Sequence, residues 1–255
     1  MASGAASATG ATVDRANVAL FGGLAESWWD PEGPSRLLHR INPVRLAFVR
    51  EAALAHFGRA GEARRALAGL AALDVGCGGG LVAEPLARMG AAVVGLDASE
   101  EAIAVAREHA RLSGLSIDYR AGEADALAAA MPHAFDLVTC FEVVEHVADV
   151  PLFLGALHRL MKPGGLLVYS TPNRTALSHA VMITAAERLL RTLPAGTHDW
   201  NRFLTPGELA GHLQRAGFAV GPVRGLSWRP GRGFHLSDEL SVNYLGTATA
   251  GERPS

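Results

Sequence analysis

The chain has 255 residues, of which 49% are hydrophobic and 19% are charged, and its formal net charge at pH 7 is -2. This near-neutral charge, without a basic stripe interleaved with aromatic residues, argues against a nucleic-acid partner. No run of about 18 apolar residues is present, which argues against a membrane-spanning helix. Cys77 and Cys140 fall in or beside predicted core strands, which favours buried thiols in a reducing compartment and a cytoplasmic location.

The N-terminal part divides into a tail and a helical region. Residues 1–13 carry almost no hydrophobic bulk and lack the charged start and apolar middle of a secretory signal. We therefore expect a disordered tail there and a single domain over residues 14–250. Residues 14–65 are expected to be helical, with the adjacent Trp28 and Trp29 packing as a lid.

Arg45 is a candidate ligand-binding residue in this helical region. Pro43 predicts a helix start, because proline is common in the first helical turn. A guanidinium placed just after it can pair bidentately with a carboxylate. The alternative is an arginine on a solvent-exposed helix face.

The stretch that organises the chain is residues 72–80, an apolar run followed by four glycines within five residues. It predicts a buried strand, a tight turn and then a helix over 81–89. Gly76 and Gly78 have no Cβ atoms, so they tolerate positive φ and let backbone approach a ligand closely. A turn of this kind is typical of nucleotide-sized ligands, although dinucleotide-binding folds use a similar one.

Two carboxylates near this turn narrow the ligand class. Asp74 precedes the first glycine, where it would repel a pyrophosphate and attract an ammonium group. Asp97 ends the next predicted strand, over residues 92–97, at the place where ribose hydroxyls are usually bound. S-adenosylmethionine has an ammonium, a ribose diol and no phosphate. It is therefore the predicted co-substrate, and solvated carboxylates beside a glycine turn are the alternative.

Downstream, helices and strands alternate. Ser99 is expected to cap a helix, and a short strand at 117–120 leads to an acidic loop in which Glu123 is a candidate partner of the adenine amino group. A solvated loop acid is the alternative reading of Glu123. A fourth strand is predicted at 135–141.

Glu142, Glu145 and His146 follow the fourth strand, at the edge where parallel sheets bind ligands. If the segment is helical, the spacing i, i+3, i+4 brings the three side chains onto one face. Two carboxylates and an imidazole can hold a divalent ion such as Mg²⁺, which would bind and acidify a catechol-like substrate. The alternatives are acids at a helix start, or a metal-free site with Glu142 or His146 as general base.

The rest of the chain completes an α/β pattern. A helix at 150–161 and a strand at 166–170 precede an insertion at 174–203, whose segment 176–193 is amphipathic. Such a stripe usually packs on a sheet, but a basic amphipathic helix also suits a membrane interface. Two further strands complete a mostly parallel, seven-stranded Rossmann-like sheet with helices on both faces.

The glycine turn and the two aspartates resemble the class I methyltransferases, which bind S-adenosylmethionine on a Rossmann-like sheet. The flanking motifs, within residues 17–246, are more specific and resemble the ubiquinone-biosynthesis O-methyltransferase family. These motifs are WWD at 28–30 with EG at 32–33, LHRINP at 38–43, LDVGCGGG at 73–80, EHV at 145–147, KPGG at 162–165, GTHD at 196–199 and VNY at 242–244.

This resemblance implies a bifunctional enzyme that methylates 2-polyprenyl-6-hydroxyphenol and 3-demethylubiquinol. The family's S-adenosylmethionine contacts fall on Arg45, Gly76, Asp97 and Phe141, the last a departure from a more common methionine. Members described as metal-dependent use a Glu-x-x-Glu-His arrangement, which falls on 142–146.

The family is also associated with membranes through the insertion, which implies a peripheral contact at 176–193 on the inner face of the membrane, and association with other enzymes of ubiquinone biosynthesis. Two other functions stay open. One is a class I methyltransferase of another small molecule, and the other is a non-catalytic subunit that binds S-adenosylmethionine or lipid.

Overall fold

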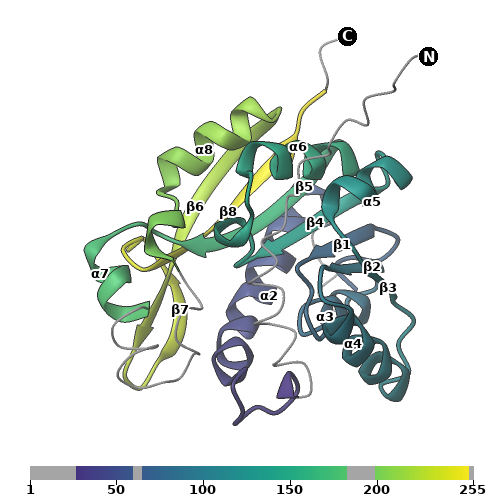
Figure 1. The fold of residues 1–255 in the computed structure, drawn as a ribbon, viewed down its shortest axis with the longest axis horizontal. Coiled ribbons are helices and arrows are strands. Elements are labelled where there is room, and N and C mark those ends of the chain that lie inside the picture. The colour runs from purple at the N-terminus through teal and green to yellow at the C-terminus, as the bar shows by residue number, and fades with distance from the viewer. Residues whose placement is uncertain (1–26, 60–64, 183–198, 253–255) are drawn as a thin grey trace, which may run out of the picture.

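The computed structural model describes residues 27–59, 65–182 and 199–252. The predicted tail at 1–13, the start of the N-terminal helical region and most of the amphipathic segment at 176–193 lie outside the described residues. Within the described part, the chain forms one sheet with helices on both faces (Figure 1), as predicted.

The sheet has eight strands in the order β3-β2-β1-β4-β5-β8-β6-β7. The first five strands of the chain pair in parallel, and β8, β6 and β7 are antiparallel. The strands are β1 (Ala71–Val75), β2 (Ala92–Asp97), β3 (Asp118–Ala121), β4 (Phe135–Phe141), β5 (Met161–Pro172), β6 (Phe218–Arg229), β7 (Gly233–Ser237) and β8 (Asn243–Ala250).

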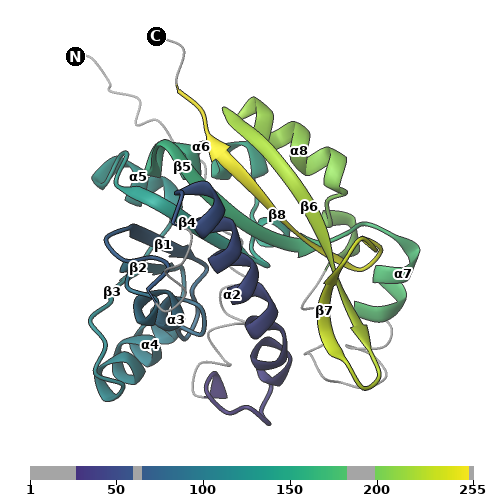
Figure 2. The ribbon, with the colours of Figure 1, turned by 180° about the vertical axis from the view of Figure 1, so that it is seen from behind.

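Helices cover both faces. The α-helices are α2 (Arg36–His56), α3 (Ala83–Arg88), α4 (Glu100–Leu112), α5 (Ala124–Ala130), α6 (Val150–Leu160), α7 (Ala176–Ser178) and α8 (Pro206–Arg215). In Figures 1 and 2, α5, α6 and α8 lie above the sheet and α2, α3 and α4 lie below it. Two apolar cores correspond to these layers. None of the described helices is both long and apolar enough to cross a bilayer.

Local sequence signals explain several boundaries. The Ser99 hydroxyl accepts a hydrogen bond from the Ala102 N–H at the start of α4, as predicted. Thr205 and Glu208 form a reciprocal capping box that begins α8. Central strands such as β1 are buried apolar runs because helices pack on both of their faces.

The predicted start of a helix at Pro43 is wrong. Pro43 lies inside α2, which begins at Arg36. An interior proline costs about 3 kcal/mol because it removes one hydrogen bond and clashes with the preceding turn. The turn before it carries Leu37 and Ile41, which pack against β6, β7 and β8. That burial compensates for the proline and extends the helix toward its N-terminus.

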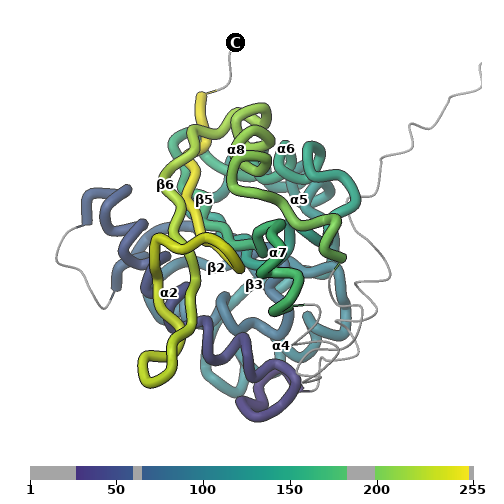
Figure 3. The backbone as a smooth tube through the Cα atoms, turned by 90° about the vertical axis from the view of Figure 1, so that its left-hand side faces the viewer, coloured from purple at the N-terminus to yellow at the C-terminus, as the bar shows by residue number. Residues whose placement is uncertain are grey.

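The sheet has one strand more than the seven predicted. Strand β6 runs as far as Arg229, and a turn containing Gly231 returns the chain as β7, which begins at Gly233. Both glycines have positive φ, of 77° and 72°, which suits a tight turn. The hairpin is formed because Leu226 in β6 and Phe234 in β7 pack against α2, and Figure 3 shows it alongside that helix.

Candidate active site

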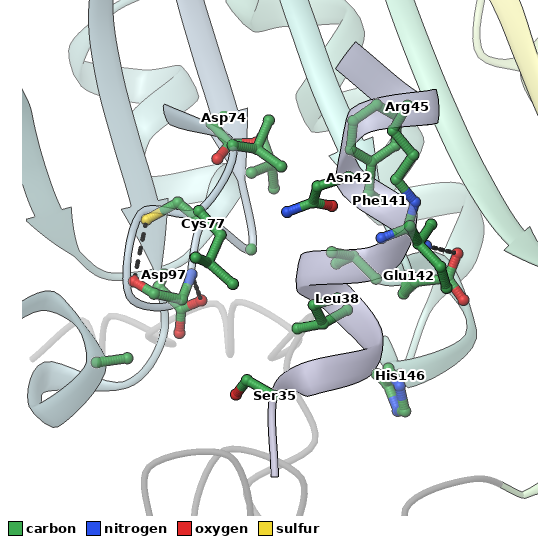
Figure 4. A pocket seen from close by; sticks show the side chains of 18 of the residues that line it. Ser35, Leu38, Asn42, Arg45, Asp74, Cys77, Asp97, Phe141, Glu142 and His146 are labelled. Carbon is green, nitrogen blue, oxygen red and sulfur yellow. Dashed lines mark hydrogen bonds and ion pairs between the residues drawn. The ribbon is translucent and has the colours of Figure 1, made fainter. Parts of the chain in front are cut away.

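A cavity of about 390 Å³ lies at the carboxyl ends of the parallel strands, where α/β sheets bind ligands. In Figure 4, Asp74 and Asp97 lie on one side, and Glu142 lies on the other with Arg45, which projects from α2. The cavity brings together every residue predicted to bind the co-substrate, together with both predicted catalytic residues. These residues are Arg45, Asp74, Gly76, Gly78, Asp97, Glu123, Phe141, Glu142 and His146.

The glycine turn leaves no room for side chains. Gly76 and Gly78 have positive φ, of 69° and 50°. A Cβ atom on Gly76 would lie 2.3 Å from Val143, and one on Gly78 would lie 2.6 Å from Trp28. The Gly76 N–H donates to the Leu96 carbonyl at 2.8 Å. The turn is thus fastened to β2, and this N–H is already paired within the protein.

Trp28 and Trp29 pack over this turn, as the predicted lid requires. The Trp28 ring covers Gly78. The Trp29 indole donates to the Gly79 carbonyl at 2.9 Å and stacks on His109, with ring centroids 3.4 Å apart and planes inclined by 5°. Trp28 therefore forms part of the cavity wall, and Trp29 packs behind it against the turn and His109.

Asp97 connects the turn to the end of β2. One carboxylate oxygen accepts from the Gly78 N–H at 2.8 Å, and the other accepts from the Ser99 N–H at 2.9 Å. Burial raises the pKa of Asp97 above its ordinary value, and these backbone N–H groups oppose the increase. Each oxygen keeps a second lone pair, so the carboxylate can still accept from the two hydroxyls of a ribose.

Asp74 is a buried carboxylate with a partner on one oxygen only. The Thr139 hydroxyl donates to Oδ1 at 2.7 Å. Oδ2 has no hydrogen-bond partner among the described residues, and Asp74 is 2% exposed. Burial raises the pKa of Asp74 to about 7. An uncompensated acceptor of this kind at a cavity wall suits a cationic group of a ligand.

Other unpartnered polar atoms point to the same cavity. Among the cavity-lining residues that the structure describes, the buried side-chain atoms without a hydrogen-bond partner are Trp28 Nε1, Asn42 Oδ1, Arg45 Nε, Asp74 Oδ2 and Asn243 Oδ1. Buried polar groups are normally satisfied. This mixture of donors and acceptors fits S-adenosylmethionine, which carries an ammonium, a carboxylate and ribose hydroxyls. The sequence reading assigned no binding role to Trp28, Asn42 or Asn243.

Arg45 lies at the Glu142 end of the cavity. Its Nη2 lies 2.7 Å from Glu142 Oε1, and its guanidinium carbon lies 5.4 Å from the centre of the Phe141 ring. Arg45 is 2% exposed, which excludes the alternative of an arginine on a solvent-exposed face. Its Nε–H is still available to a ligand carboxylate, so the predicted contact with the methionine group stays a prediction.

Glu142 has an unusual backbone conformation. Its φ of 55° is uncommon outside glycine and is found mainly where the surrounding structure enforces it, often at functional sites. The Ser170 hydroxyl donates to Oε1 at 2.6 Å, and the Asn243 amide donates to both carboxylate oxygens. Glu142 is thus held at the cavity by several neighbouring elements.

The three predicted metal ligands do not form a metal site as arranged here. Glu142 precedes the short 3-10 helix Val144–His146, so the expected single helical face is absent. Glu142 is paired with Arg45, and Glu145 accepts from the Thr171 hydroxyl at 2.9 Å. His146 Nε2 lies 4.0 Å from Glu145 Oε1. No group of three possible ligands is gathered within the described part of the chain.

Comparisons with known proteins show the family of the chain. The family model described as "Methyltransferase domain" matches residues 73–169. The chain is 48% identical to the ubiquinone biosynthesis O-methyltransferase of Azorhizobium caulinodans, over 92% of this chain and 93% of that protein. It is 49% identical to the protein of the same name in Dinoroseobacter shibae, over 96% of this chain and 98% of that protein.

Solved structures are similar in fold. The crystal structure of magnesium protoporphyrin IX methyltransferase from Synechocystis PCC 6803 has a TM-score of 0.57 and 20% identity, over 84% of this chain and 87% of that one. The chain is therefore a class I, S-adenosylmethionine-dependent methyltransferase, and it belongs to the ubiquinone biosynthesis O-methyltransferase family.

Proposed function

We propose that this enzyme methylates a ring hydroxyl of polyprenyl catechol and quinol intermediates of ubiquinone biosynthesis, namely 2-polyprenyl-6-hydroxyphenol and 3-demethylubiquinol. The observation that carries the proposal is a single cavity with two chemically different ends. Asp74 and Asp97 lie at one end, and the Glu142 carboxylate lies at the other. The names of the relatives support the substrate class.

The end of the cavity near Glu142 is suited to an aromatic acceptor with an apolar tail. Met182 lines the same cavity, as do Leu226 and Phe234 from the β6–β7 hairpin. Apolar walls with few, well-placed polar groups are typical of sites for such ligands. The hairpin that adds the eighth strand therefore also contributes to the acceptor end.

The reaction needs a base and an oriented acceptor. In our proposal, Glu142 accepts the proton of the acceptor hydroxyl. The oxygen then forms a bond to the methyl carbon as the carbon–sulfur bond breaks, and its electron pair stays on sulfur as a neutral thioether. His146 also lies on the cavity wall and is the second candidate base. Positioning two substrates in one water-poor cavity contributes further to the rate.

The divalent cation expected from the sequence has no part in this proposal. In the present arrangement Glu142 has the Arg45 guanidinium as its partner, and a metal ion would have to displace that cation. The residues as placed do not fit a metal ion, so no step of the proposed reaction is assigned to one.

The direct test is methyl transfer from labelled S-adenosylmethionine to a short-chain demethylubiquinol, before and after chelation. We expect turnover, because one cavity brings together the predicted co-substrate residues and the candidate base, and we expect the chelated enzyme to keep most of it. Loss of turnover on chelation, with recovery on adding Mg²⁺, would instead favour the metal site. Tight co-substrate binding without turnover would favour another acceptor or a non-catalytic binding subunit.

A peripheral membrane contact is also part of the proposal, because a polyprenyl substrate is nearly insoluble in water. Within the described part of the predicted segment 176–193, Leu177 on α7 is 50% exposed and Val181 is 42% exposed. Exposed apolar side chains at neighbouring helical positions suit an interface with lipid. Association with other enzymes of the pathway stays a prediction.

We expect Leu177→Glu to reduce co-sedimentation of the protein with anionic liposomes by several-fold, because a charge at the contact opposes burial in lipid. Leu112→Glu is the matched control. Leu112 is 69% exposed and ends α4, on the other side of the molecule from α7 (Figure 1). Equal co-sedimentation of the two variants and the unmodified protein would contradict the contact.

A further inference from the structure

Asn243 holds the carboxylate that the proposed reaction uses as its base. Its Nδ2 donates to Glu142 Oε1 at 3.0 Å and to Oε2 at 2.9 Å. Asn243 is 7% exposed, and it lines the cavity. In the sequence reading it served only as part of a family signature, without a role of its own.

The two oxygens of Glu142 have different surroundings. Oε1 has three partners, namely Arg45 Nη2, the Ser170 hydroxyl and the Asn243 amide. Oε2 accepts only from Asn243 among the residues that the structure describes. A carboxylate oxygen can accept two hydrogen bonds. Oε1 is therefore saturated, and Oε2 is the oxygen able to accept a further proton donor from the cavity.

The sheet topology explains why Asn243 reaches this position. Phe141, at the end of β4, pairs with Ser170 in β5. Strand β8 is antiparallel to β5, so its first residue, Asn243, pairs with Pro172 near the carboxyl end of β5. An antiparallel strand begins where its parallel neighbours end. Three adjacent strands thus place an acid, a hydroxyl and an amide together.

We propose that Asn243 is a positioning residue that fixes the rotation of the Glu142 carboxylate, so that Oε2 faces the acceptor hydroxyl. Of the three donors to Glu142, only Asn243 contacts both oxygens. Loss of its amide leaves Arg45 and Ser170 on Oε1, and the carboxylate can then turn about its terminal bond. This inference rests on the proposed role of Glu142 as the base.

A double-mutant cycle tests the proposal on the full-length enzyme with the short-chain demethylubiquinol. We expect Asn243→Ala to lower kcat about 10- to 100-fold, since the Glu142 carboxylate loses the charge-assisted hydrogen bonds that fix its rotation. The KM for either substrate should change by about twofold or less. In the Glu142→Gln background the same substitution should change kcat by about threefold or less, because a residue that acts through Glu142 has little left to position.

Asn173→Ala is the matched control. Asn173 is also 7% exposed, and its amide donates at 2.9 Å to the Leu240 carbonyl instead of Glu142. We expect this variant to keep a kcat near that of the unmodified enzyme. If Asn243→Ala does not fold, Asn243→Leu removes the donor at similar side-chain volume, and folding is checked by the melting temperature.

Each failure has its own signature. Three results would overturn the positioning role while leaving Glu142 as the base. They are equal decreases in kcat from Asn243→Ala in the two backgrounds, an effect of Asn243→Ala on KM alone, and an equal decrease in kcat in Asn173→Ala. Full activity of Glu142→Gln would instead overturn the proposed base, and the positioning role with it. Absence of turnover in the unmodified enzyme would overturn the proposed acceptor.

Discussion

Glu142→Gln is expected to lower the kcat of methyl transfer by about 10²- to 10⁴-fold, the usual contribution of a general base. Glutamine keeps the shape of the side chain, and its amide oxygen can take the place of Oε1 and still accept hydrogen bonds. It cannot take a proton from the acceptor hydroxyl. Removing the charge also leaves the buried Arg45 guanidinium without its ion-pair partner, so a decrease in stability is expected as well.

The measurement is single-turnover methyl transfer at saturating concentrations of both substrates, with the melting temperature recorded to show that the variant is folded. Glu123→Gln is a useful control, because Glu123 lines the other end of the cavity. That variant is expected to weaken co-substrate binding with little change in the single-turnover rate. A Glu142→Gln enzyme within threefold of the unmodified rate would transfer the role of base to His146.

The sequence was sufficient to predict that the glycine turn, Asp74 and Asp97 lie together at one edge of the sheet. Asp74 and Asp97 belong to adjacent parallel strands, β1 and β2, whose carboxyl ends meet at one edge. The glycine turn between β1 and α3 is a local signal, because Gly76 and Gly78 need positive φ. Periodicity and local turn chemistry therefore predict this part of the site from a short stretch of chain.

The acceptor end was harder to predict, because it depends on contacts between distant segments. Asn243 is 101 positions from Glu142 in sequence, and nothing in the local pattern around Asn243 indicates which strand it will adjoin. The expected helical face of Glu142, Glu145 and His146 failed for a related reason. The positive φ of Glu142 ends any regular helix there, and tertiary contacts with Arg45 and Asn243 stabilise that conformation.

The N-terminal helix shows the same limit. The preference of proline for the first helical turn predicted a helix start at Pro43. Apolar contacts of Ile41 with Leu226 and Leu245 instead stabilise α2 on the N-terminal side of the proline. The β6–β7 hairpin was missed because its stability depends on α2, which precedes it by far in sequence. Local propensity is a weak predictor wherever packing against a distant element decides the outcome.

Asp74→Asn is expected to stabilise the ligand-free protein above neutral pH while weakening co-substrate binding. Burial raises the pKa of Asp74 from an ordinary value of 3.8 to about 7. The unfolded chain therefore loses this proton at lower pH than the folded one does. The tighter binding of this proton by the folded state contributes fully to stability below about pH 4. This contribution to stability is lost as the pH rises through about 7.

The size of the effect follows from the same difference. The interval between 3.8 and about 7, at 1.36 kcal/mol for each pH unit, gives roughly 4 kcal/mol for a fully charged Asp74 in the free protein. Asparagine can still accept from the Thr139 hydroxyl, and it brings no charge into the core. We therefore expect the melting temperature of the variant to exceed that of the unmodified protein increasingly from pH 5 to pH 8.

Both proteins are measured by calorimetry across this pH range, with and without S-adenosylmethionine. The measurements separate the destabilisation caused by the buried charge from its contribution to co-substrate binding. Asp136→Asn is the control, because Asp136 has Lys162 as an ion-pair partner at 2.8 Å, and loss of that ion pair should lower the melting temperature.

The co-substrate should stabilise the unmodified protein more than the Asp74→Asn variant, since its ammonium supplies the partner that Asp74 Oδ2 lacks. A melting-temperature difference independent of pH would contradict the raised pKa, and equal stabilisation by the co-substrate would contradict the ammonium contact. On this prediction, the ammonium of the bound co-substrate offsets the free-energy cost that the buried Asp74 carboxylate imposes on the ligand-free protein.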